Sequence, residues 1–127
     1  MTREQKDLLI KDLCGRLTHG VKCKILETNE VKILGAIQYD GENTLFDFWE
    51  DDQKIQYGYQ LYLSEFKPYL FPLSSITTDQ WNDFGEFTTN DITYVGANVD
   101  WVDKNHFDYR GLIPMGLAED ATGLNIY

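Results

Sequence analysis

The densest group of chemically versatile side chains lies in residues 100–111, which read DWVDKNHFDYRG. A histidine with a nearby carboxylate is the minimum for general acid–base catalysis, and a guanidinium can hold an anion through its planar fork. This segment places a histidine and an arginine four residues apart, with an aspartate between them. Its candidate binding residues are Trp101, His106, Asp108, Tyr109 and Arg110.

The same residues have a structural interpretation. Arg110 could pair with Asp103 or Asp108, and His106 could cap the C-terminus of a helix, where the helix dipole favours a cation. No nucleophile elbow, phosphate-binding loop, dinucleotide glycine pattern or zinc-ligand spacing occurs in the sequence. We therefore assign no catalytic residue, metal ligand or cofactor from the sequence, and we favour binding over catalysis.

Two other segments have weaker signals. Glu50, Asp51 and Asp52 supply the oxygen ligands that calcium prefers, but without the spacing of an EF-hand loop, so a hairpin tip is the simpler interpretation. An aromatic segment interrupted by two prolines could form a groove for a partner or pack beneath a loop; its rings are Tyr62, Phe66, Tyr69 and Phe71.

The charge of the chain restricts its partners. The formal net charge is −10; residues 1–38 carry seven basic and five acidic side chains, whereas residues 39–127 carry four basic and sixteen acidic ones. Because the larger segment repels phosphates, we expect no direct binding to nucleic acid. The acidic surface could instead attract a basic partner, imitate nucleic acid toward a protein that binds it, or serve only to keep the protein soluble.

The N-terminal segment has the pattern of a helix. Thr2 and Gln5 have the spacing of a capping box, and Gly20 marks the exit. The apolar positions predict an inward face that includes Cys14, with Asp12 on the outside; the other members of that face are Leu9, Ile10, Leu13 and Leu17.

From residue 21 the hydrophobic period changes to two, which is typical of strands. Strands are expected at residues 21–26, 31–37, 44–49 and 55–59, separated by short turns, so we predict an antiparallel meander of about four strands. Residues 62–73 are expected to be extended or irregular because of Pro68 and Pro72.

Two helices are expected in the C-terminal half, from Thr77 to about Phe87 and from Asp100, as its cap, to about Asn105. The predicted fold is therefore α+β, with the N-terminal helix packed on the meander and residues 1–127 forming a single domain. Neither a signal peptide nor a stretch of about 20 apolar residues is present, so we expect a cytoplasmic protein with no membrane contact and with reduced thiols.

Three stretches resemble a known family. They are Lys6–Leu17, Lys67–Ser75 and the motif HFDYRGLIPMGLA at residues 106–118, and together they are similar to a family of small uncharacterised proteins of gut Bacteroidetes, their prophages and other mobile elements. The sequence departs from the family at Thr18-His19 and in residues 88–98. The resemblance implies a bacterial protein encoded on a mobile element, and no activity or catalytic residue.

The leading functional hypothesis is a non-enzymatic domain, an accessory or interference factor that binds a protein partner. One alternative is a small hydrolase or transferase centred on His106, Asp108 and Arg110, which requires these side chains to converge in one pocket. Another is a nucleic-acid mimic, which requires carboxylates in two rows at phosphate spacing.

Overall fold

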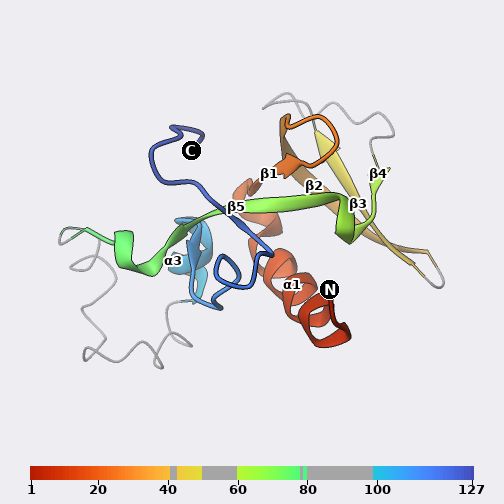
Figure 1. Cartoon of the computed structure of the whole chain (residues 1–127), viewed down its shortest axis with the longest axis horizontal. Coiled ribbons are helices and arrows are strands. Elements are labelled where there is room, and N and C mark those ends of the chain that lie inside the picture. Colours follow the sequence, from red (N-terminus) through yellow and green to blue (C-terminus); the bar gives the residue numbers. More distant parts are fainter. Residues whose placement is uncertain (41–42, 50–59, 78, 80–98) are drawn as a thin grey trace.

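The computed structural model describes residues 1–40, 43–49, 60–77, 79 and 99–127. Within these residues the chain combines an N-terminal helix with a mixed sheet whose strand order is β4-β3-β2-β1-β5-β6, with β7 also paired to β5. The helix α1 (Arg3–Arg16) crosses the sheet beside the C-terminal segment, so the two ends of the chain lie on the same body of structure (Figure 1).

Helix α1 begins where the sequence predicts. The Thr2 hydroxyl accepts the Gln5 amide hydrogen and the Gln5 side chain accepts the Thr2 amide hydrogen, which completes the capping box. The helix leads into the 3-10 turn η1 (Leu17–His19) and exits at Gly20, whose φ of 69° lies in the left-handed region. The predicted exit is confirmed.

The predicted buried face of α1 is wrong at two positions. Leu9 and Leu13 enter the core as expected, but Cys14 is exposed, and Asp12 is fully buried together with Arg16. Compared with the predicted apolar face, the buried face of α1 is therefore turned toward two charged residues. A search for apolar periodicity cannot find such a face, because it counts charged side chains as outside.

The central strands form the predicted meander. Strands β1 (Lys22–Ile25), β2 (Val31–Asp40), β3 (Asn43–Trp49) and β4 (Gln60–Leu61) pair antiparallel in succession. Phe46 and Phe48 lie on the same face of β3 and are buried in the core. The expected fourth strand at residues 55–59 and the hairpin tip at residues 50–52 lie outside the described residues.

Strand β2 contains one extra residue at Gly35. The register with β3 shifts between Leu34 and Ala36, which is the signature of a β-bulge. The Trp49 ring packs directly on Gly35, and a Cβ at position 35 would lie 2.2 Å from a ring carbon. Only glycine therefore fits beneath this indole.

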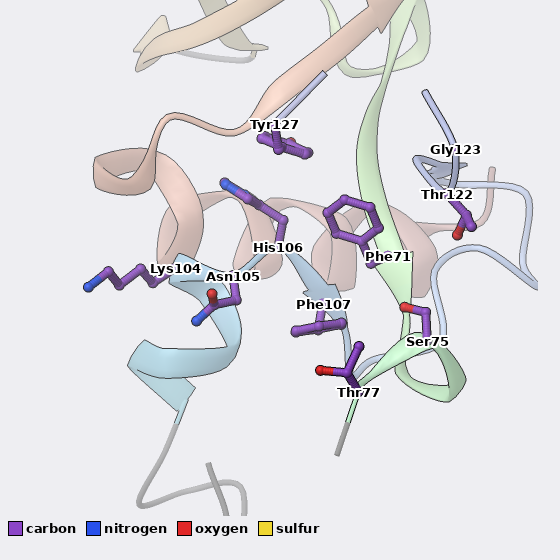
Figure 2. Close-up of a pocket in the computed structure, with 10 residues that line it drawn as sticks. All are labelled: Phe71, Ser75, Thr77, Lys104, Asn105, His106, Phe107, Thr122, Gly123 and Tyr127. Carbon is purple, nitrogen blue, oxygen red and sulfur yellow. The ribbon is translucent and has the colours of Figure 1, made fainter. Parts of the chain in front are cut away.

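Strand β5 (Phe66–Pro72), preceded by the 3-10 turn η2 (Leu63–Glu65), makes the sheet mixed. It pairs antiparallel with β1 but parallel with β6 (Phe107–Asp108) and β7 (Glu119–Asp120), so the wholly antiparallel sheet of the prediction is extended by parallel neighbours. At the junction with β6, Phe71 and Phe107 lie side by side with ring centroids 6.0 Å apart (Figure 2).

The described C-terminal half contains one short α-helix, α3 (Val99–Lys104), after the 3-10 turn η3 (Leu73–Ser75). Asp100 lies within α3, so it is not the cap that we predicted. The other expected helix, from Thr77 to about Phe87, falls mainly on residues that the structure does not describe.

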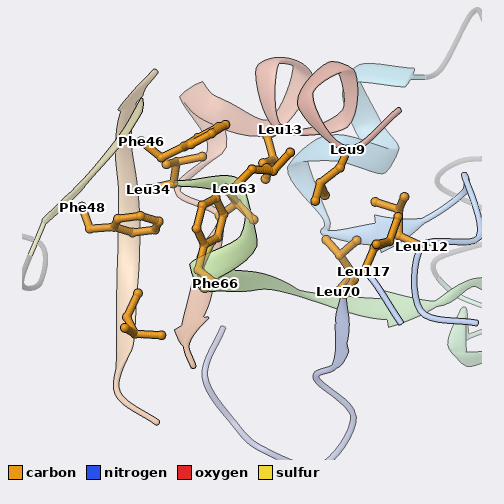
Figure 3. Close-up of a cluster of buried hydrophobic side chains, with 14 residues drawn as sticks. Leu9, Leu13, Leu34, Phe46, Phe48, Leu63, Phe66, Leu70, Leu112 and Leu117 are labelled. Atoms are coloured by element: carbon orange, nitrogen blue, oxygen red, sulfur yellow. The ribbon is translucent and has the colours of Figure 1, made fainter. Parts of the chain in front are cut away.

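The main core draws on both ends of the chain. It lies between α1 and the sheet, where leucines of α1 meet phenylalanines of β3 and β5 and leucines from beyond β6 (Figure 3). Its labelled members are Leu9, Leu13, Leu34, Phe46, Phe48, Leu63, Phe66, Leu70, Leu112 and Leu117. None of the helices in the described part of the chain has the length and apolar character needed to cross a membrane.

Candidate functional site

A pocket of about 390 Å³ opens where β5, α3, β6 and the last residues of the chain meet. It is walled by aromatic rings and bordered by polar side chains (Figure 2). We call it the His106 pocket. Its lining residues are Phe71, Ser75, Thr77, Lys104, Asn105, His106, Phe107, Thr122, Gly123 and Tyr127. The volume is near the lower end of the range for ligand pockets, about 300–1,000 Å³.

His106 follows α3 in a backbone conformation that usually selects glycine. Its φ of 63° is left-handed, and its amide donates to the Asp103 carbonyl, one of the two hydrogen bonds of a Schellman motif. Its own carbonyl accepts from Phe71 N–H at 2.8 Å. Hydrogen bonds to α3 and β5 thus hold a non-glycine residue in a strained conformation, a feature that concentrates at functional sites.

The His106 imidazole is buried and uncharged at neutral pH. Burial, and after it the neighbouring positive charges, Arg16 first, lower its pKa from 6.5 to about 4. His106 therefore does not act as the cationic helix cap that the sequence suggested, although it does follow the helix end. No hydrogen-bond partner reaches its Nδ1 atom from the described residues.

Tyr127 closes one side of the pocket. Its ring stacks on His106 with centroids 3.6 Å apart and planes 13° from parallel (Figure 2). Its hydroxyl donates to the Tyr69 carbonyl and accepts the Lys22 amide hydrogen, both at 2.8 Å. Burial of this hydroxyl raises the pKa of Tyr127. These bonds attach the end of the described chain to β1 and β5.

A continuous set of rings adjoins Tyr127, because Phe71 lies 5.8 Å from the Tyr127 ring. Phe71 packs at 6.0 Å from Phe107, and Trp101 of α3 stacks on Phe107 at 5.7 Å with planes 9° from parallel. Trp101 therefore supports the pocket wall from behind and does not line it. Of the four aromatic residues considered for a groove, Phe71 alone is among the lining residues.

Asp108 has a local structural role. Its two carboxylate oxygens accept the amide hydrogens of Leu112 and Ile113, at 2.8 and 2.9 Å. These bonds close a loop that passes through Gly111, whose φ of 74° is left-handed. The carboxylate is thus committed to the backbone that leads Leu112 into the core.

Arg110 belongs to a buried charge cluster on α1. Asp12 binds Arg16 through two hydrogen bonds of 2.7 and 3.0 Å and binds Arg110 Nη1 at 2.9 Å. Arg16 also donates to the Phe107 carbonyl at 2.6 Å. The ring of Tyr109 lies near both guanidinium groups, with its centroid 4.5 Å from Cζ of Arg110 and 5.5 Å from Cζ of Arg16.

Asp103 of α3 completes this cluster, with an oxygen 3.9 Å from Arg16 Nε. Burial raises the pKa of Asp103, and the adjacent Arg16 charge opposes that shift. Asp103 also packs against Gly15 of α1, where a Cβ would lie 2.9 Å from its carboxylate. The cluster therefore joins α1 to α3 and β6, and Arg110 pairs with Asp12 and not with the predicted Asp103 or Asp108.

The five candidate residues consequently separate into distinct sites. His106 lines the pocket and Trp101 supports its wall, whereas Asp108 closes a loop. Tyr109 and Arg110 join the buried cluster on α1. The convergence of His106, Asp108 and Arg110 that the hydrolase or transferase alternative requires is not found.

The described residues offer little other reactive chemistry. They contain no group of three or more histidine, cysteine or acidic side chains arranged to hold a metal ion. Cys23 is fully buried, and burial raises the pKa of its thiol, which keeps it protonated and unreactive.

The comparisons with known proteins do not extend this description. No family model, curated protein or solved structure matches the chain. The resemblance carried by residues 106–118 therefore stays a prediction.

Sequence reasoning missed most of the pocket. Phe71, Phe107 and Tyr127 come from three distant segments, so no local spacing joins them. One signal was present in the sequence: Phe107 directly follows His106, so a search around the histidine includes this ring.

Proposed function

We propose that the protein is a non-enzymatic binding domain, an accessory or interference factor, and that a protein partner inserts a side chain into the His106 pocket. The observation that carries this proposal is His106 itself. It stands in the wall of an aromatic pocket, in a strained conformation, with a buried nitrogen that has no hydrogen-bond partner among the described residues.

The chemistry of the pocket supports binding. A neutral imidazole surrounded by rings can contact an apolar group. Among the described residues no carboxylate is free to make His106 a base, because Asp108 is bonded to backbone amides. Aromatic side chains supply large contact areas at low entropic cost, which is why they are enriched at the centres of interfaces.

The test is selection from a random-peptide display library on the wild-type protein and on Thr122→Trp. Thr122 is exposed and lines the pocket, so an indole there blocks the opening without replacing a core residue. Thr28→Trp is the matched control, because Thr28 is an exposed residue outside the lining.

We expect clones that bind the wild type and Thr28→Trp equally and bind Thr122→Trp at least about tenfold less. Circular dichroism would check that all three proteins are folded. Recovery of no clones, or of clones that bind Thr122→Trp as well as the wild type, would refute the proposal.

A further inference from the structure

The His106 pocket has a charge opposite to that of the whole protein. Among the described residues that line it, Lys104 has the only side chain that is charged at neutral pH, and none is an aspartate or glutamate. The chain as a whole carries 21 acidic and 11 basic residues. A ligand that enters the pocket therefore passes one positive charge, although the protein as a whole is acidic.

The pocket has a charged rim and an uncharged interior. Lys104 is exposed at the last residue of α3, and its side chain extends outward from the pocket (Figure 2). The interior contains the rings of Phe71, Phe107 and Tyr127 beside neutral His106. An uncharged ring fits this interior, whereas a carboxylate would keep its hydration by staying at the rim.

The polar atoms at the rim are suited to a peptide backbone. Asn105 uses its side-chain amide hydrogen to bond the Trp101 carbonyl, which leaves its oxygen able to accept. Ser75 donates its hydroxyl hydrogen to the Pro72 carbonyl, so its oxygen also remains an acceptor. Both acceptors can receive backbone N–H groups from a segment that crosses the pocket.

We propose that the segment recognised by the His106 pocket is a peptide in which an aromatic residue adjoins an aspartate or glutamate. The ring packs against the aromatic wall where Phe71 contacts both Phe107 and Tyr127, and the carboxylate pairs with Lys104 at the rim. This inference rests on the proposed function and specifies its partner. It differs from the expectation that a basic partner is drawn to the acidic surface, because a basic side chain would be repelled by Lys104.

A single-stranded nucleic acid could also place a base among aromatic rings. Such binding depends on a groove of positive charge that follows the phosphates. Lys104 supplies only one such charge among the described lining residues, on a chain with a net charge of −10. The charges therefore favour a peptide.

The experiment uses the peptides selected on the wild-type protein. Their sequences are read, and one peptide is synthesised with fluorescein together with two variants, aromatic→Ala and Glu→Gln (or Asp→Asn). Affinities are measured by fluorescence polarisation on the wild type, Lys104→Gln and Lys11→Gln. Lys11 is exposed on α1, so its replacement removes the same charge outside the pocket.

We expect the selected clones to share an aromatic–acidic pair. Removing the ring should weaken binding about tenfold or more. Removing the carboxylate should weaken binding to the wild type and to Lys11→Gln about threefold in about 0.05 M salt. The two peptides should bind Lys104→Gln equally well, and they should also bind the wild type equally well in about 0.5 M salt.

Two results would overturn the inference while the proposed function stands. One is a set of pocket-dependent clones without an acidic residue, and the other is a carboxylate effect of the same size on Lys104→Gln. If labelled oligothymidine binds the wild type and loses affinity on Thr122→Trp, the peptide assignment is wrong. If no pocket-dependent clones are recovered, both the inference and the proposed function fail.

Discussion

His106 combines two features that lower stability: a left-handed backbone and a buried imidazole. Asparagine is among the residues that adopt this backbone most readily, and it has no proton to gain in the acidic range. The variant His106→Asn therefore keeps a polar side chain at the position and removes its titration.

We predict that acidification destabilises the wild type more than His106→Asn. The folded pKa, about 4, is below the ordinary 6.5, so the unfolded chain binds the proton more readily and stability is lost as the pH falls through this window. The full loss for such a shift is on the order of 3 kcal/mol. Urea unfolding at several pH values between about 7 and about 4.5 measures it.

The difference between the two proteins isolates His106 from the other titrating groups. Asp103 acts in the opposite direction, because its pKa is raised and its protonated form is favoured in the fold. Since Asp103 is present in both proteins, its contribution largely cancels. Parallel pH profiles for the wild type and His106→Asn would show that the imidazole is not held neutral by the fold.

The sequence predicted most single elements because their signals are local. The capping box of α1, the exit at Gly20 and the strands β1–β3 all follow from spacings within a few residues. The buried face of α1 was not predictable in this way. Asp12 and Arg16 are buried because Arg110 and the Phe107 carbonyl, about 90 or more residues away, complete their bonds.

The pocket could not be predicted for the same reason. Its walls are assembled by the parallel pairing of β5 with β6 and by the stacking of Tyr127 on His106, and neither contact leaves a pattern in the sequence. Residue chemistry did single out His106, but as a charged cap or a base, since burial cannot be read from the neighbours of a histidine.

The bulge in β2 gives a prediction for one element. Replacing Gly35 with alanine places a methyl group within the Trp49 indole, and overpacking of this kind costs about 1–3 kcal/mol, with larger values where the ring cannot move. We expect Gly35→Ala to lower the urea midpoint by a corresponding amount.

A double-mutant cycle with Trp49→Leu tests the cause: the loss of stability from Gly35→Ala should fall by more than half when the indole is absent. An unchanged cost would place the strain in the backbone of the bulge.

At the scale of the whole molecule, two kinds of contact join the ends of the chain. Leu9 and Leu13 share an apolar core with Leu112 and Leu117, while Asp12 and Arg16 join residues beyond α3 through charges. The apolar contacts need only approximate shape, whereas the charges must be matched in number and direction. The charge cluster therefore determines the position of the C-terminal segment relative to α1, and this in turn determines the position of His106.

We predict that Arg16→Met destabilises the protein by about 3–5 kcal/mol, because Asp12 stays buried and loses two of its hydrogen bonds. Arg3→Met, on the exposed first turn of α1, is the control and should change stability by less than about 0.5 kcal/mol. In Asp12→Leu/Arg16→Met both members of the pair are removed. Asp103, whose pKa burial already raises, can take up a proton, and Arg110 is partly exposed and can hydrate, so we expect much of the lost stability to return. Urea unfolding followed by tryptophan fluorescence and by circular dichroism measures the wild type and the three variants. A double variant less stable than Arg16→Met would mean that the ion pair itself, and not the cost of a buried carboxylate with too few hydrogen bonds, holds the two ends together.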